Sequence, residues 1–272
     1  MNAVLTQDVV AKVKQEVFDP RGTIQSVTIL SQAPAGDGTK VTFVIGLDKG
    51  TINGVMARDD KQKVSGFFVS PGVSESYAAY VTKAPIHLPF AGAWFVGSGG
   101  PDPKANHHVG NRAQNYAYDF VVMKNGTTHT GDGRSNKDYF AYNQPVLSPV
   151  SGTVAVLVDG VPDNQPGEMN PYYAFGNSIV IRDEFNEYAV IAHFVPGSFR
   201  VKVGQHIAAG DVLGLCGNSG NSSEPHIHFH LQNSVNIADA DGLPITFQGL
   251  VEDNKPVSSG QLKAHITVAN GH

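Results

Sequence analysis

Three histidines occupy every second position of the stretch PHIHFHL, which begins at Pro225. In an extended strand, successive side chains point to opposite faces of the sheet. We therefore expect His226, His228 and His230 to share one face of a strand, with the apolar residues between them on the other face. Three neutral imidazoles along one face need polar partners, water or a metal ion. The pattern indicates a polar site on that face.

Three further segments carry side chains that can bind a metal or move protons. His108 lies eleven residues before Asp119, which sits in an aromatic, β-prone run. A carboxylate in such a run needs a partner, and a metal ion or a buried cation would satisfy it. His193 ends another β-prone segment, and a loop of small residues, 217–223, leads into the histidine strand. These segments are candidates for one shared site.

The segments around these residues have the pattern of short strands and turns that is typical of a β domain. Short strands separated by Gly, Pro and Asn turns are expected, with no long helical pattern between them, at Gly152–Val158, Ser178–Arg182, Tyr188–Phe194, Val212–Gly217 and His226–Gln232. This pattern predicts a two-sheet antiparallel β sandwich or barrel-like domain. The stretch 161–176 is too long for a hairpin loop, and we expect an ordered surface loop beside a site.

The first part of the chain has a different organisation. Apolar residues at near-helical spacing predict an amphipathic helix over Thr6–Val17. Turn residues then separate four β-rich segments, Gln25–Ser31, Thr39–Leu47, Thr51–Arg58 and Lys63–Ser70, which predict an antiparallel meander. We therefore divide the mainly β chain into a small α+β domain at 1–84, a linker with a first strand at 85–105, and the β domain at 106–272.

Composition excludes several classes of function. The 272 residues include 41% hydrophobic and 16% charged residues, 30 Gly and 16 Pro, which suits an ordered, turn-rich β protein. The formal net charge of -5, without a basic run, argues against nucleic-acid binding. No segment reaches the ~18 consecutive apolar residues of a membrane span. Cys216 is the only cysteine, so an intramolecular disulfide and a thiolate-rich metal site are excluded, and we expect a buried structural thiol.

Several consecutive motifs resemble the lysostaphin-type zinc endopeptidases, which cut peptide bonds in bacterial cell-wall peptidoglycan. The motifs are HFVPG from His193, AGDVLG from Ala209, GNSG from Gly217 and PHIHF from Pro225. The resemblance covers about 106–232 and implies the duplicated hybrid motif fold of these peptidases. It also implies action on peptidoglycan stem or cross-bridge peptides in the cell envelope, by a periplasmic or secreted protein, although the first residues lack the apolar core of a signal peptide.

The same resemblance implies the roles of individual residues. One zinc ion per chain would be held by His108, Asp119 and His228, while His193 and His226 would remain unligated beside the metal-bound water. In the usual family motif the early histidine lies four residues before the aspartate, whereas here the gap is eleven.

The roles of two further histidines, His107 and His230, therefore each have two alternatives. His107 competes with His108 as the early ligand. His230 occupies a position where relatives commonly place a glutamate, and it is either a hydrogen-bond partner behind the ligands or a solvated strand histidine.

The implied ligands make chemical sense for catalysis. Two imidazoles and one carboxylate leave an open position on tetrahedral zinc, whereas structural zinc sites fill all four positions with protein ligands. Zinc lowers the pKa of bound water from about 15.7 to about 7 and polarises a carbonyl group. Histidines titrating near pH 6.5 can exchange protons with the reacting groups.

Two functions of other classes fit part of the sequence. Residues 201–214 resemble a β-turn element shared with lipoyl and biotinyl carriers, but no Met-Lys-Met attachment motif accompanies it. A catalytically inactive relative could act as a cell-wall binding or regulatory module. Such relatives usually lack metal ligands, and the implied ligands are all present here, which favours catalysis.

Overall fold

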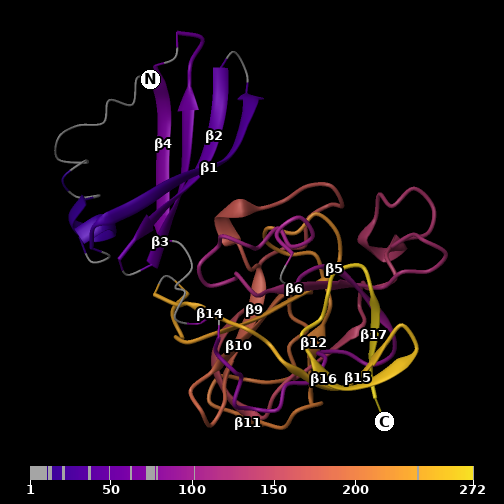
Figure 1. Ribbon diagram of the computed structural model, residues 1–272. Helices are drawn as coiled ribbons and strands as arrows, with labels where there is room; N and C mark the ends of the chain where they lie inside the picture. The colour runs from indigo at the N-terminus through magenta and orange to yellow at the C-terminus, as the bar shows by residue number, and fades with distance from the viewer. Residues whose placement is uncertain are drawn as a thin grey trace. The chain divides into compact units, whose positions relative to one another are not determined.

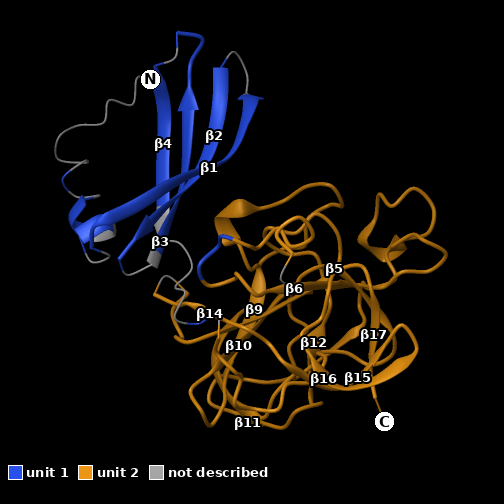
Figure 2. Cartoon of the chain, viewed as in Figure 1, with its two compact units in different colours: residues 1–78, 110–112 blue, residues 79–109, 113–272 orange. Residues whose placement is uncertain are grey.

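The structure is a computed structural model, and it describes residues 11, 14–19, 22–35, 38–48, 50–61, 63–71, 77, 79–100, 102–237 and 239–271. The chain divides into two compact units (Figure 2). Unit 1 comprises residues 1–78 and 110–112, and unit 2 comprises residues 79–109 and 113–272.

Unit 1 is a four-stranded antiparallel sheet in the order β1-β2-β3-β4, with the strands β1 (Ile24–Ala35), β2 (Gly38–Leu47), β3 (Gly50–Arg58) and β4 (Val64–Pro71). Sequential strands pair throughout, so the predicted meander is confirmed. Ile45, Leu47 and Ile52 form its small buried cluster. Of the predicted helix, residues 6–10, 12 and 13 lie outside the described residues, and a single π-helical turn, η1 (Lys14–Phe18), follows.

Unit 2 contains the remaining strands (Figure 1) and two short 3-10 turns, η4 (Asn136–Asp138) and η5 (Pro171–Tyr173). The strands are β5 (Trp94–Ser98), β6 (Tyr118–Val121), β7 (Pro145–Leu147), β8 (Gly152–Val158), β9 (Asn177–Arg182), β10 (Tyr188–Phe194), β11 (His206–Ile207), β12 (Val212–Leu215), β13 (Ile227–Gln232), β14 (Gly242–Leu243), β15 (Phe247–Glu252), β16 (Lys255–Gly260) and β17 (Thr267–Asn270). An 11-stranded sheet runs β11-β8-β9-β10-β13-β6-β5-β17-β15-β16, with β14 also pairing to β13, and β12 pairs with β7 in a second sheet.

The mainly β, antiparallel fold class is therefore confirmed. Strands β9, β10 and β13 are buried along nearly their whole length, because both faces of the sheet are covered there. On one face, the rings of Tyr118, Phe120 and Phe229 pack edge-on against Phe247. This aromatic layer holds β6 and β13 together from behind, which leaves their opposite face for polar side chains.

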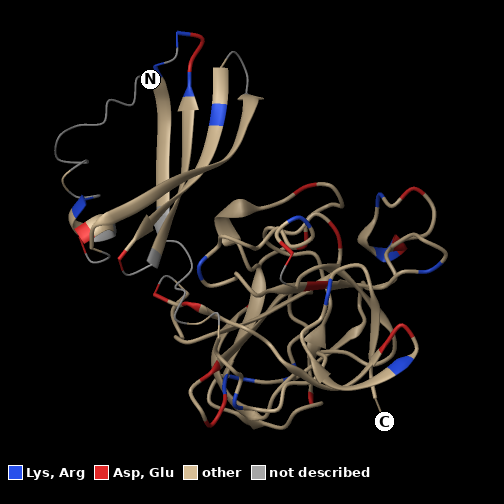
Figure 3. Cartoon of the chain, in the orientation of Figure 1, with Lys and Arg blue, Asp and Glu red and all other residues tan. Residues whose placement is uncertain are grey.

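Charged residues are dispersed over the described chain, in loops and also within some strands (Figure 3). Among the described residues, no helix has the length and apolar character needed to cross a membrane.

Candidate metal centre

The pairing of β6 with β13 places a carboxylate opposite a histidine. Asp119 and His228 are direct cross-strand partners, so their side chains share one face of the sheet. The His228 Nδ1 atom lies 3.0 Å from Asp119 Oδ1. Tyr118 and Phe120, the neighbours of Asp119, face the aromatic layer instead, as strand alternation requires. The sheet register therefore builds the core of a polar site.

The second oxygen of the carboxylate faces the histidine pair of the early segment. His108 Nε2 lies 2.9 Å from Asp119 Oδ2, and its side chain is only 9% exposed. His107 Nε2 lies 3.4 Å from the same oxygen, but its side chain is 68% exposed. One nitrogen of each histidine and one oxygen of Asp119 all lie within 4.8 Å of one another. Both histidines are thus near enough to compete for one ligand position, and His108 is the one already held in the interior.

His193 reaches the site through an irregularity in β10. Ala192 is the cross-strand partner of His228, so regular alternation would turn the side chain of His193 to the opposite face. A register shift between Ile191 and Phe194 interrupts the alternation, and His193 adopts a positive φ of 70°. The bulge places the His193 ring 4.6 Å from the ring of His226 and 5.9 Å from that of His228.

The small-residue loop before β13 holds this bulge in place. The carbonyl of Ser219 accepts a hydrogen bond from His193 Nδ1 at 2.7 Å, while Ser219 Oγ donates to the carbonyl of Phe194 at 2.8 Å. Asn177 Nδ2 donates to the same carbonyl, also at 2.8 Å. A non-glycine residue rarely adopts a positive φ unless its surroundings impose it. Ser219 and Asn177 supply that constraint, which the sequence alone did not reveal.

His226 is the residue immediately before β13, and its ring lies in the site. Its Nδ1 donates to the carbonyl of Glu224 at 2.8 Å, and Ser222 Oγ lies 3.1 Å from the same nitrogen. Its Nε2 lies 3.6 Å from Asp119 Oδ1. Because a backbone carbonyl can only accept, Nδ1 of both His193 and His226 carries a proton, so Nε2 is the nitrogen with the lone pair in the neutral form of each ring.

Burial keeps three imidazoles of the site, those of His193, His228 and His230, neutral. It lowers the pKa of His228 to about 4 and that of His193 and His230 well below the usual value for histidine, and neighbouring histidines lower the last two further. Burial alone would raise the pKa of Asp119. Charge interactions with His108 and His226, together with the hydrogen bond from His108, outweigh it and hold that pKa well below the ordinary value. At neutral pH the site thus offers uncharged rings at His193, His228 and His230 and an ionised carboxylate at Asp119.

Other side chains that the sequence did not single out also border the site. The ring of Phe175, near the end of the long loop, lies 5.8 Å from the ring of His228 and 5.6 Å from that of His230. Gln232 is buried and hydrogen-bonded to His230. The proximity of Phe175 agrees with the expectation that this loop lies beside a site. Gln232 extends the two-residue spacing of the histidines by one step, and this spacing is the one signal that could have identified it.

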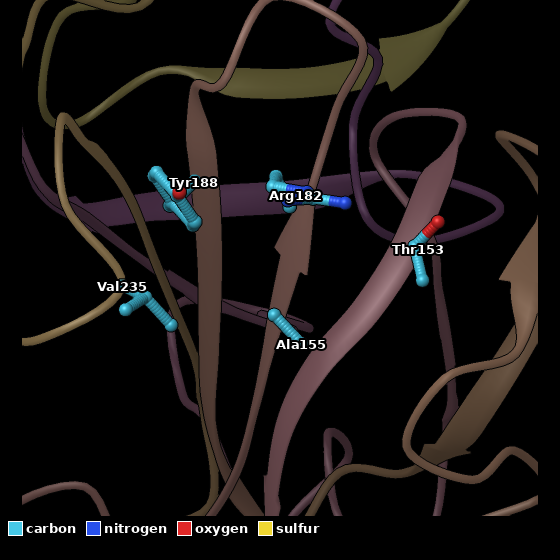
Figure 4. Close-up of a pocket in the computed structure, with 5 residues that line it drawn as sticks. All are labelled: Thr153, Ala155, Arg182, Tyr188 and Val235. Atoms are coloured by element: carbon cyan, nitrogen blue, oxygen red, sulfur yellow. The ribbon is translucent and has the colours of Figure 1, made fainter.

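A pocket lies farther along the same sheet (Figure 4). It is lined by Thr153, Ala155, Arg182, Tyr188 and Val235. Tyr188 is the cross-strand partner of Gln232, four residues beyond His228. At about 3.3 Å per residue, this places the pocket region about 13 Å along the strand from His228.

Comparison with known proteins finds a family match within the second unit. Residues 137–240 match the sequence model of Peptidase family M23. His193, His226 and His228 lie within the matched residues, whereas His108 and Asp119 precede them. A stretch of 66 residues, 24% of this chain, is 41% identical to the Endolysin 2638A of Staphylococcus phage 2638A and spans 14% of that protein's length.

Solved structures show partial similarity. The catalytic domain of the antimicrobial peptidase lysostaphin from Staphylococcus simulans is 19% identical, with a TM-score of 0.33, and the match covers 56% of this chain and 88% of that domain. A zinc-containing peptidase from Vibrio cholerae is 18% identical, with a TM-score of 0.36, and the match covers 93% of this chain and 63% of that protein.

Proposed function

Because residues 137–240 match the model of Peptidase family M23, and the motifs of residues 106–232 resemble the lysostaphin type, we propose that this chain is a zinc-dependent endopeptidase that hydrolyses peptide bonds of peptidoglycan. One observation carries the proposal. The carboxylate of Asp119 has an imidazole nitrogen about 3 Å from each oxygen, His108 on one side and His228 on the other. The proposed substrates are stem or cross-bridge peptides, and the proposed place of action is the cell envelope. Both follow from the resemblance of residues 106–232 to lysostaphin-type peptidases.

The residues present fit a zinc ion. Imidazole nitrogen and carboxylate oxygen are zinc ligands, and three of them leave the fourth position of a tetrahedral ion open. Within the described part of the chain, the ion-pair partners of Asp119 are all imidazoles, so no lysine or arginine competes for its charge. A buried carboxylate surrounded by imidazole rings is suited to a bound cation.

We propose that His108 Nε2, Asp119 and His228 Nδ1 hold one zinc ion per chain. When bound, zinc acts as a Lewis acid that activates a water molecule and polarises the scissile carbonyl. His108 takes precedence over His107 in this proposal because its ring is already buried and close to the carboxylate.

His193 and His226 are proposed to move protons and to stabilise charge on the substrate. In its neutral form each has its lone pair on Nε2, because the Nδ1 proton is donated to a backbone carbonyl. A free Nε2 can accept a proton from water and pass it to the leaving amine. Once protonated, the same nitrogen donates a hydrogen bond to a developing oxyanion. The 4.6 Å between the two rings allows both to face one reacting group.

The test combines metal content with digestion of cell walls. Purified protein is expected to bind about one zinc per chain and to release peptides from sacculi that mass spectrometry can identify. His228→Ala is expected to abolish both properties. His226→Ala is expected to retain zinc and to lower kcat by about 10²–10⁴, the usual contribution of a proton-transfer group. His206→Ala, at an exposed position of β11, is the matched control and should change neither.

The outcome that would overturn the proposal is a folded wild-type chain that binds no zinc and releases no peptide from sacculi even after zinc is added. A chain that binds sacculi without cutting them would then be a cell-wall binding module. Zinc loss in His226→Ala with full retention in His228→Ala would reverse the division between ligands and proton-transfer residues.

A further inference from the structure

A chain of hydrogen bonds runs from His228 away from Asp119 into the interior. His228 Nε2 lies 3.0 Å from His230 Nδ1, and His230 Nε2 lies 3.0 Å from Gln232 Oε1. Gln232 Nε2 then donates to the carbonyl of Ser234 at 2.7 Å. His228, His230 and Gln232 are 2%, 0% and 1% exposed, so water does not replace these partners. The three side chains share one face of β13, as their two-residue spacing requires.

The far end of this chain fixes its direction. The carbonyl of Ser234 can only accept a hydrogen bond, so the amide nitrogen of Gln232 must face it. The amide oxygen of Gln232 therefore faces His230. An oxygen of this kind also only accepts, so the proton of the neutral His230 ring must be on Nε2.

The proton position on His230 then determines that on His228. With Nε2 protonated, the Nδ1 atom of a neutral His230 carries a lone pair, and it can only accept from His228 Nε2–H. His228 is consequently left with its lone pair on Nδ1. That lone pair faces Asp119 Oδ1 over 3.0 Å, so two acceptors converge where a cation would bind both.

We propose that Gln232 and His230 are positioning residues, which hold His228 in the single tautomer that presents Nδ1 to the metal. The ring of Phe175 packs against both imidazoles and limits their rotation. The metal in this inference rests on the proposed function, whereas the tautomer is a property of the metal-free chain. In this proposal His230 is the hydrogen-bond partner that orients His228, and it is neither a solvated residue nor a metal ligand.

The experiment changes the chain of hydrogen bonds at two points. Gln232→Met keeps the length of the side chain but removes the acceptor for His230. His230→Phe keeps a ring of similar shape but removes the acceptor for His228. His230→Glu restores an acceptor for His228 Nε2–H. Leu231→Val is the matched control, because Leu231 is buried on the opposite face of the same strand.

Two readouts are measured on each variant. Long-range ¹H–¹⁵N correlation spectra of the metal-free protein give the protonated nitrogen of each histidine, and chelator competition gives the zinc Kd. Gln232→Met and His230→Phe should mix the two tautomers of His228 and weaken zinc binding by about 10–100-fold, the usual effect of losing a partner behind a ligand. His230→Glu should recover the Nε2–H tautomer and most of the affinity. Leu231→Val should change neither property of the folded protein.

The results separate this inference from the proposed function. A wild-type chain that binds no zinc removes the proposed function, while the ring spectra still test the tautomer. Wild-type zinc binding with an unchanged tautomer and Kd in Gln232→Met and His230→Phe would overturn the positioning role and leave the zinc site in place. If Gln232→Met does not fold, His230→Phe and its rescue by His230→Glu decide the question.

Discussion

The hairpin between β9 and β10 contains a buried carboxylate whose ionisation should destabilise the fold. Asp183 Oδ1 accepts hydrogen bonds from the backbone N–H groups of Phe185 and Glu187, at 2.8 and 2.9 Å. Its Oδ2 atom is buried without a hydrogen-bond partner. Burial raises the pKa of Asp183 from 3.8 to about 6, and the nearby charge of Glu187 adds to the rise. The backbone donors oppose this effect but do not cancel it.

The sign and size of the effect follow from linkage. Because the pKa is higher in the folded state, the contribution of Asp183 to stability is fully present below about pH 4 and is lost as the pH rises through about 6. A rise of the pKa from 3.8 to about 6 corresponds to an upper bound of about 3 kcal/mol in the free energy of unfolding. Local relaxation and solvent reduce this value.

The perturbation is Asp183→Asn, which keeps an oxygen for the two backbone donors and removes the titration. We expect the difference in unfolding free energy between wild type and variant to be constant below pH 4. It should then shift in favour of the variant by about 1–3 kcal/mol up to pH 7. Urea unfolding of the metal-free protein, followed by the fluorescence of Trp94, measures it. Trp94 is the single tryptophan, and it is buried within unit 2.

Glu184→Gln removes the same charge from an exposed position of this hairpin and serves as the control. Its difference from wild type should stay within a few tenths of a kcal/mol across the same pH range, because exposed charges contribute little to stability. A difference between wild type and Asp183→Asn that does not vary with pH, or that grows in favour of wild type toward pH 7, would refute the reasoning.

Three further predictions concern the site and its supports. Asp119→Asn should weaken zinc binding while leaving the fold intact, since it removes the only carboxylate among the proposed ligands, and a zinc Kd equal to that of wild type would contradict its role. Gly176→Ala should lower both stability and activity, because a Cβ atom there would lie 2.4 Å from backbone atoms of Ser219, the residue that holds His193. Thermal unfolding measures the loss of stability, and peptide release measures the loss of activity. Gly160 also has a positive φ but has open space around it, so Gly160→Ala separates the effect of the clash from that of backbone strain. Cys216 should resist iodoacetamide in the folded protein and react after unfolding, because the residue is 1% exposed and burial raises the pKa of its thiol. Rapid labelling of the native chain at pH 8 would contradict this prediction and argue for local opening.

The sequence alone predicted the features that depend on local periodicity. Alternation in PHIHFHL correctly placed His228 and His230 on one face, because side-chain direction in a strand has a period of two. Turn residues between β-rich segments correctly predicted the meander of unit 1 and several strands of unit 2 to within two residues. Residue types restricted the candidate metal site to imidazole and carboxylate ligands, since the chain has one cysteine. The roles of these residues stay predictions.

Only the tertiary structure decided features that join distant segments. The register of β13 against β6 sets His228 opposite Asp119, 109 residues away along the chain, and no local pattern specifies that pairing. The bulge at His193 contradicts strand alternation, and it persists because the carbonyl of Ser219 holds the ring. Likewise, the tautomer of His228 depends on where the carbonyl of Ser234 lies. Strand periodicity is a property of the local backbone, whereas these constraints arise only when separate segments pack against one another.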